Sequence, residues 1–132
     1  MPRKRPVPTD PNEWLRRARS NLARAKNHIP EACLEDLCFD SQQAAEKAIK
    51  AVLIHRGMIF PCTHDLARLF TNLRRGGFKI PKYLDRAKGL TRFAVETRYP
   101  GLSGPVTERQ YRGTVRIAEA VLRWAERQIA KP

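Results

Sequence analysis

Between residues 107 and 129, apolar side chains recur in alternating steps of four and three along an otherwise polar segment. The members of this stripe are Tyr111, Val115, Ala118, Leu122, Ala125 and Ile129. Such spacing places them on one side of an α-helix, which must bury that side against other elements. Thr107 and Gln110 at the start form the sequence pattern of a capping box. We therefore expect a long helix packed lengthwise in a bundle.

Proline and glycine residues divide the rest of the chain into further helix-like segments. We expect helices over residues 11–29, 31–56, 64–75 and 81–99. Asp10 is a favourable N-cap for the first of these helices. No segment has the alternating apolar pattern of a β-strand. The predicted fold class is therefore all-α, an up-and-down bundle of four to five helices.

The length of 132 residues predicts a single domain. We expect residues 1–8, which are basic and rich in proline, to form a disordered arm, and residues 9–132 to form the bundle. No apolar run reaches the ~20 residues that a membrane-spanning helix needs. The apolar core of a secretory signal is also missing. We expect a cytoplasmic protein without a membrane partner.

The three cysteines do not form a recognisable metal or disulfide pattern. Cys62 and His64 are separated by one residue, and Cys33 and Cys38 would lie on different faces of a helix. We expect the cysteines to be small buried apolar groups in a reducing compartment, with no metal and no cofactor bound. His64 follows Thr63 at a helix start, where a structural role is the first interpretation.

The chain carries a formal net charge of +13, which favours polyanionic partners. The charge is uneven, because residues 31–65 contain three basic and six acidic residues while every other stretch is basic. We expect the segment 31–65 to lie in the interior with basic neighbours around it. A soluble basic protein with no nucleic-acid role remains the alternative interpretation.

An arginine row follows the last predicted helix. Its members are Arg109, Arg112, Arg116, Arg123 and Arg127. At ~100° per residue they fall within about 60° of one another around the helix. The row could contact successive phosphates. It could instead be a solvated face, because Glu108, Glu119 and Glu126 lie along its edge.

Three stretches together resemble a known family. They are DSQQAAEKAIKAVL at 40–53, FPCTHDL at 60–66 and VETRYPG at 95–101, with Asp10 and Trp14 ahead of them. In order and spacing they are similar to the small stand-alone prokaryotic HEPN domain proteins. The resemblance implies a helical bundle that assembles as a homodimer. It also implies partnership with a minimal nucleotidyltransferase in toxin–antitoxin-like modules.

The resemblance also implies a possible activity, because many HEPN proteins are metal-independent ribonucleases. Their signature is an arginine followed, after about four to six residues, by a histidine. In that motif the arginine stabilises phosphate charge and the histidine transfers protons. If Arg98 takes the arginine position, Ser103, Gly104 and Pro105 occupy the histidine positions. The ribonuclease motif is therefore missing. Arg98 could persist as a phosphate or nucleotide ligand with Tyr99 as a stacking surface. It could instead form a structural ion pair with Glu96 or contact a carbonyl at a helix C-terminus.

Three functional hypotheses follow. The leading one is a non-catalytic HEPN protein that dimerises and binds a minimal nucleotidyltransferase, a nucleotide or RNA. The second is a divergent ribonuclease that uses Arg98 with His64 or another proton donor, and the third is a purely structural partner subunit. The candidate nucleotide- or RNA-binding residues are Arg98, Tyr99, His64, Arg112 and Arg116.

Overall fold

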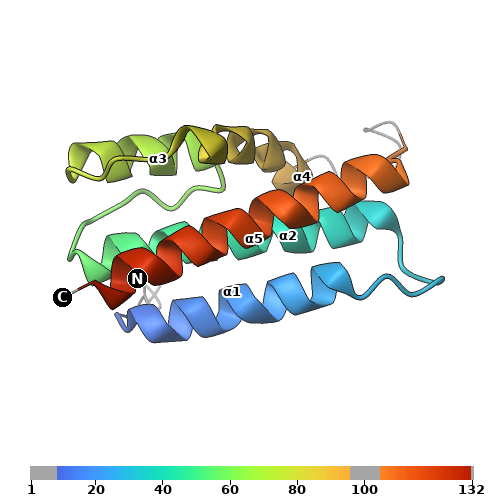
Figure 1. Cartoon of the computed structure of the whole chain (residues 1–132), viewed down its shortest axis with the longest axis horizontal. Coiled ribbons are helices and arrows are strands. Elements are labelled where there is room, and N and C mark those ends of the chain that lie inside the picture. The colour runs from blue at the N-terminus through green and yellow to red at the C-terminus, as the bar shows by residue number, and fades with distance from the viewer. Residues whose placement is uncertain (1–8, 96–104, 132) are drawn as a thin grey trace, which may run out of the picture.

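A computed structural model of the chain, describing residues 9–95 and 105–131, confirms the all-α bundle (Figure 1). In chain order its elements are α1 (Pro11–Lys26), α2 (Leu34–His55), α3 (Leu66–Arg75), the 3₁₀ helix η1 (Lys82–Thr91), α4 (Arg92–Val95) and α5 (Glu108–Ala130). Within the described residues there is no strand. The prediction for residues 1–8 falls outside the described part of the chain.

Helix α2 is the centre of the bundle and contacts each of the other five elements. The expectation that the segment 31–65 lies in the interior holds for the middle of α2, whereas Ile59 and Cys62 in the connection after it are exposed. Ala44, Ala45, Ala48 and Ala51 are fully buried, because their small side chains let neighbouring helices approach closely. The small-residue face of α2 is therefore used for helix packing inside the protomer.

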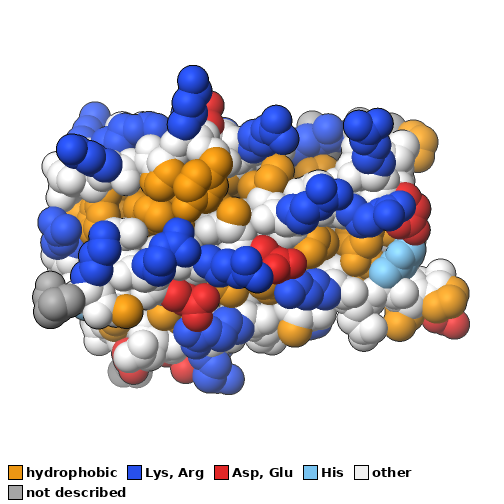
Figure 2. Space-filling view, in the orientation of Figure 1, with side chains coloured by type: hydrophobic (Ala, Val, Ile, Leu, Met, Phe, Trp, Pro, Cys, Tyr) orange, Lys and Arg blue, Asp and Glu red, His pale blue; other side chains and the backbone are white. Residues whose placement is uncertain are grey.

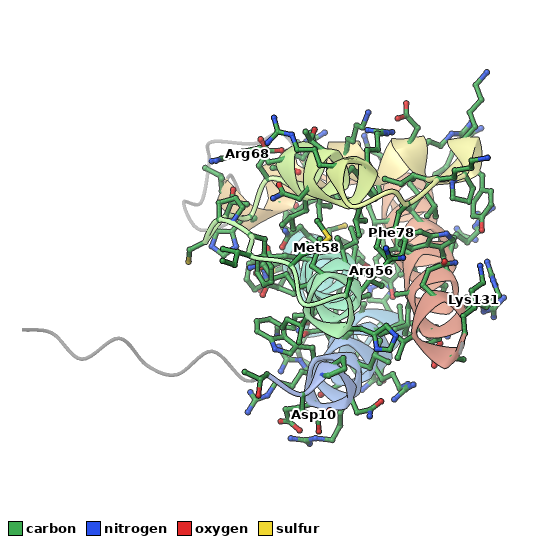
Figure 3. The ribbon with its side chains drawn as sticks, turned by 90° about the vertical axis from the view of Figure 1, so that its left-hand side faces the viewer. Asp10, Arg56, Met58, Arg68, Phe78 and Lys131 are labelled. Atoms are coloured by element: carbon green, nitrogen blue, oxygen red, sulfur yellow. The ribbon has the colours of Figure 1, made fainter. Side chains whose placement is uncertain are left out.

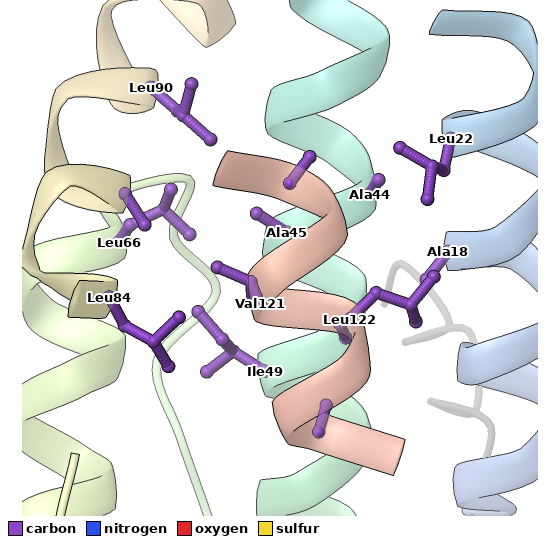
Figure 4. Packing of buried hydrophobic residues seen from close by; sticks show 14 of the residues in the cluster. Ala18, Leu22, Ala44, Ala45, Ile49, Leu66, Leu84, Leu90, Val121 and Leu122 are labelled. Atoms are coloured by element: carbon purple, nitrogen blue, oxygen red, sulfur yellow. The ribbon is translucent and has the colours of Figure 1, made fainter. Parts of the chain in front are cut away.

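The apolar core lies on both sides of α2 and α5 (Figure 4). Ala18 and Leu22 of α1 approach these two helices from one side, and Leu66 and Leu84 approach from the other. The inward side of α5 contains most of the predicted stripe, with Tyr111, Ala118, Leu122 and Ala125 buried and Val115 and Ile129 partly buried. The capping box of Thr107 and Gln110 is formed as predicted.

Residues 56–65 run back along the bundle, so that α3 has the same direction as α2 (Figure 1). Gly57 begins this return with φ of 72°, a left-handed conformation that glycine adopts without steric cost. At one end of the connection, Met58 lies close to Gly76 after α3. At the other end, the carbonyl of His64 accepts a hydrogen bond from Gln42 in α2. The connection thereby brings His64 against the middle of α2.

Three predicted helix boundaries were wrong. The helix predicted over 11–29 ends at Lys26, and Ile29 is 46% exposed, because Pro30 disfavours helical backbone at the residue before it. The helix predicted over 31–56 begins only at Leu34. The helix predicted over 64–75 begins at Leu66, because Asp65 rather than Thr63 accepts from the first free backbone N–H groups.

The continuous α-helix predicted over 81–99 was also wrong over its described part. The chain forms the 3₁₀ helix η1 followed by the short α4, and residues 96–99 lie outside the described part. Within η1 the buried residues Leu84, Ala87 and Leu90 recur every three positions. Three residues per turn is the 3₁₀ period, so this spacing aligns the apolar side chains only in the tighter helix.

The prediction that all three cysteines are buried was correct for one of them. Cys38 is buried against Thr114, and burial raises the pKa of its thiol. Cys33 and Cys62 are exposed. Cys33 is the N-cap of α2, and Cys62 lies on the 56–65 connection, and both of these are surface positions.

Candidate functional site

A buried polar cluster surrounds Glu46 in the middle of α2. Its carboxylate accepts hydrogen bonds from Lys50 Nζ at 2.9 Å and Gln42 Nε2 at 3.0 Å. His64 Nδ1 lies 2.8 Å from Oε1 of the same carboxylate. Burial acts to raise the pKa of Glu46, but the bonds from Lys50, Gln42 and His64 outweigh it and lower the pKa below its usual value. Glu46 is therefore an anion at neutral pH.

This ionised carboxylate fixes the tautomer of His64. Because Glu46 can only accept, Nδ1 of His64 carries the proton, which leaves Nε2 as the nitrogen that can exchange one. The side chain of His64 is 48% exposed, whereas that of Glu46 is 4% exposed. The pair thus presents an oriented imidazole at the surface, a geometry suited to proton transfer.

Lys50 lies in the wall of an apolar pocket. Its Nζ is 5.9 Å from the ring centroids of both Trp14 and Phe60. Met58 and Cys62 also line this pocket. The ammonium group forms an ion pair with Glu46 and cation–π contacts with the two aromatic rings. These contacts hold Lys50 in place.

A second polar cluster ties α1 to α2 around Asp40. The Asp40 carboxylate accepts from Arg24 Nη2 at 2.7 Å and from Asn21 Nδ2 at 3.0 Å. Asn21 Oδ1 in turn accepts from Lys47 Nζ at 2.6 Å. Partial burial of Lys47 lowers its pKa. Asp40 is the single carboxylate of this described cluster. The other three members are Asn21 and the two cations Arg24 and Lys47.

The surface over α1 and α5 gathers exposed cations, shown in blue in Figure 2. We define the α1–α5 basic face by the six exposed residues Arg19, Lys26, Arg109, Arg112, Arg116 and Arg123. Three glutamates of α5 accompany them. The carboxylate of Glu126 is bound by Arg19 at 2.6 Å, and that of Glu119 is shared between Lys26 at 3.2 Å and Arg123 at 3.3 Å.

The sharing of these glutamates changes the charge balance expected from α5 alone. Glu126 pairs with Arg19 of α1, and Glu119 divides its charge between Lys26 of α1 and Arg123, so these two glutamates compensate the arginine row only in part. Arg112 is 3.8 Å from Glu108, which also lies 3.3 Å from His28. Arg116 has no ion pair among residues 9–95 and 105–131. The α1–α5 basic face therefore has a surplus of positive charge.

Three of the five predicted site residues, His64, Arg112 and Arg116, lie in the described part of the chain. Arg98 and Tyr99 lie outside the described residues. His64 belongs to the Glu46 cluster, while Arg112 and Arg116 project from α5 into solvent. The sequence interpretation also missed the Glu46 cluster itself. The signal was a carboxylate and a lysine four residues apart within an alanine-rich, otherwise apolar helix, where charges must be paired.

The described part of the chain contains no group of three or more His, Cys, Asp or Glu side chains that could hold a metal ion. Among the helices of these residues, none is long and apolar enough to cross a membrane.

Comparisons with known proteins identify the family of the chain. The profile of the HEPN domain family matches residues 11–128. No curated protein sequence matches the chain. The crystal structure of TT1696 from Thermus thermophilus is similar, with 29% identity and a TM-score of 0.79, over 89% of this chain and 97% of that chain. The crystal structure of ST0689, described as an archaeal HEPN homologue, has 27% identity and a TM-score of 0.73, over 91% of this chain and 98% of that chain.

The profile match extends from the first residue of α1 to the last turn of α5. Both similar structures are covered nearly completely, and each match covers about nine-tenths of this chain. The chain is a member of the HEPN domain family.

Proposed function

We propose that this HEPN protein is a non-catalytic binding protein that holds RNA on its α1–α5 basic face in the cytoplasm. The observation that carries the proposal is the surplus of exposed cations on that face. Phosphate groups spaced along a strand would complete the charge balance that the glutamates of α5 leave incomplete. Arginine is also suited to this task because its planar guanidinium can contact a phosphate through two N–H groups.

The geometry of α5 adds a second argument. By their spacing Arg112, Arg116 and Arg123 fall on one side of the long helix α5, about one turn and then two turns apart, so a strand lying along α5 could meet them in order. Such contacts would read phosphates and not bases, so we expect binding with little sequence preference.

The test is binding of labelled single-stranded RNA as a function of salt. A variant with Arg112→Gln, Arg116→Gln and Arg123→Gln removes three charges from the face. We expect its affinity to fall at least tenfold at low salt. The slope of log affinity against log salt should become shallower by roughly 0.7 for each phosphate contact that is lost.

A matched control removes three exposed arginines from another helix. Arg68→Gln, Arg74→Gln and Arg75→Gln change the net charge equally but lie on α3. Affinity and slope should change much less in this variant. Equal losses in the two variants would overturn the assignment to the α1–α5 basic face, and undetectable RNA binding at low salt would overturn the proposal as a whole.

The proposal includes assembly with other proteins. HEPN proteins commonly dimerise, and the family resemblance supports a homodimer that pairs with a minimal nucleotidyltransferase in a toxin–antitoxin-like module. Sedimentation velocity at micromolar concentration should give a dimer. A monomer alone and no complex with a nucleotidyltransferase encoded beside it would contradict this part.

A second candidate function, a divergent metal-independent ribonuclease, is favoured by the Glu46–His64 pair. An imidazole oriented by a buried carboxylate is the arrangement that a general base needs. RNA cleavage without metal should then be lost in His64→Ala and kept in His28→Ala. His28 is a matched control, because its Nδ1 also lies near a carboxylate, at 3.3 Å from Glu108.

The same assay decides between the two functions. Cleavage that depends on His64, or on Arg98 in a folded Arg98→Ala variant, would replace the non-catalytic proposal. Absence of cleavage by the wild-type protein, together with salt-dependent RNA binding, would support it.

A further inference from the structure

A basic and aromatic pocket opens at the end of the bundle where α2 and α5 finish, which Figure 3 shows with Arg56, Phe78 and Lys131 labelled. We call it the end pocket. Its volume of about 490 Å³ lies within the range of small-molecule sites. Four of its lining residues are the cations Arg56, Lys79, Arg127 and Lys131.

The end pocket differs from the α1–α5 basic face in its lack of acids. None of the residues that line it, all within the described ranges, is Asp or Glu. Four like charges around one cavity repel one another, and the neutral acceptors in the lining, Gln128 for Lys131 and Tyr83 for Arg127, carry no negative charge to balance them. A bound anion would offset the repulsion, so the lining points to an anionic ligand.

Arg56 is held in position for such a ligand. Its Nη1 donates to the carbonyl of Gly76 at 3.0 Å, and its guanidinium stacks on the ring of Phe78 at 4.3 Å from the centroid. Phe78 in turn packs edge-on against the buried Trp124. The guanidinium keeps further N–H donors, and its immobilisation reduces the entropy lost when an anion binds.

The pocket also presents an aromatic surface beside its cations. Tyr83 is 55% exposed, and its hydroxyl accepts a hydrogen bond from Arg127 Nη2 at 3.0 Å. Arg127 is thereby turned away from the rest of the arginine row and into the end pocket. An exposed ring next to several cations is the combination that holds a base by stacking and its phosphate by charge.

We propose that the end pocket binds a nucleotide unit, with its base on Tyr83 and its phosphate between Arg127, Lys79 and Lys131. The unit could be a free mononucleotide or one nucleotide of an RNA strand, since both offer the same base and phosphate. This site is separate from the α1–α5 basic face, so either assignment can fail without the other.

The test is calorimetric titration with AMP, adenosine and inorganic phosphate. AMP should bind at least tenfold more tightly than adenosine or phosphate, because only AMP engages the ring and the cations together. Arg127→Gln and Lys131→Gln should each weaken AMP at least fivefold. Arg123→Gln, on the same helix but outside the lining, should leave AMP binding within twofold.

A stability measurement separates ligand binding from a structural role. Lys79→Gln and Lys131→Gln should leave the urea midpoint unchanged or raise it, since each removes repulsion among the four cations. Phosphate binding as tightly as AMP would overturn the nucleotide assignment. AMP binding that is undetectable, or unaffected by Arg127→Gln and Lys131→Gln, would overturn the site.

A competition experiment distinguishes the two sources of the nucleotide. A 5′-phosphorylated tetranucleotide that displaces AMP, and that binds Arg127→Gln more weakly than wild type, would support a strand end in the pocket. A tetranucleotide that leaves AMP in place would support a free mononucleotide. In the triple variant at Arg112, Arg116 and Arg123, AMP binding should persist even where RNA binding along α5 is lost.

Discussion

Helices α2 and α5 both carry a glutamate four residues before a cation, yet the two pairs lie in opposite environments. In α2, the side chains of Lys50 and Glu46 are 9% and 4% exposed. In α5, those of Arg123 and Glu119 are 72% and 25% exposed. The sequence spacing is the same, so burial alone distinguishes the pair inside the bundle from the pair at its surface.

This difference decides what each charge can do. Inside the bundle, a charge without its partner loses the solvation of water, so α2 depends on complete pairing. At the surface, water screens each charge, so α5 tolerates a surplus of arginines at little cost to stability. We therefore expect charges on α2 to determine stability and charges on α5 to determine binding.

The strongest test of this comparison is Glu46→Leu. The variant leaves Lys50 buried without a counter-charge and removes the acceptor for Gln42 and His64, so the free energy of unfolding should fall by about 3–5 kcal/mol. Urea denaturation followed by circular dichroism would measure the loss. Adding Lys50→Met removes the unpaired charge and should recover much of it. A loss below about 1 kcal/mol in the single variant would contradict the pairing argument.

Acidification should weaken the same cluster. The folded-state pKa of Glu46 is depressed below its unfolded value, so its contribution is complete above the unfolded pKa and is lost as pH falls through the folded one. The free energy of unfolding should therefore decrease from pH 5 to pH 3. The decrease should be smaller in Glu46→Gln, which does not titrate. Equal slopes for the two proteins would show that other carboxyl groups cause the acid sensitivity.

The inward side of α5 should behave like α2 on a smaller scale. Tyr111 is buried, and its hydroxyl donates to the carbonyl of Ala25, one of the last carbonyls of α1 that no helical N–H can reach. Tyr111→Phe should lower the free energy of unfolding by about 0.5–1.5 kcal/mol, measured as a change in urea midpoint with an unchanged slope. Thr107→Ala, which removes the cap at the start of the same helix, gives a comparison of similar size.

The sequence predicted the helix caps and the apolar stripe of α5 well. Caps such as Asp10 and the Thr107–Gln110 box are local, because their hydrogen bonds join residues two or three apart. The long stripe of α5 was equally readable from its period. The 3₁₀ helix η1 was missed although Leu84, Ala87 and Leu90 have its three-residue spacing, since tertiary packing rather than local propensity favours the tighter helix there.

The site was less predictable than the fold because its contacts join distant segments. The sequence places His64 close to a helix start, but its partner Glu46 is reached only because residues 56–65 run back along α2. From the sequence alone Arg127 is one more member of the arginine row. In the structure it donates a hydrogen bond to Tyr83 of η1 and lines the end pocket. Neither contact leaves a spacing signal in the sequence.

The smallest expected effect completes the comparison. Arg112→Gln with Arg116→Gln should change the free energy of unfolding by less than about 0.5 kcal/mol, because Arg116 has no ion pair in the described part of the chain and Arg112 is a distant 3.8 Å from Glu108. Thermal melts at two protein concentrations would measure this. A loss above about 1 kcal/mol that grows with concentration would show that these arginines bind an acidic surface of a second copy. The α1–α5 basic face would then be a protein interface instead of an RNA surface.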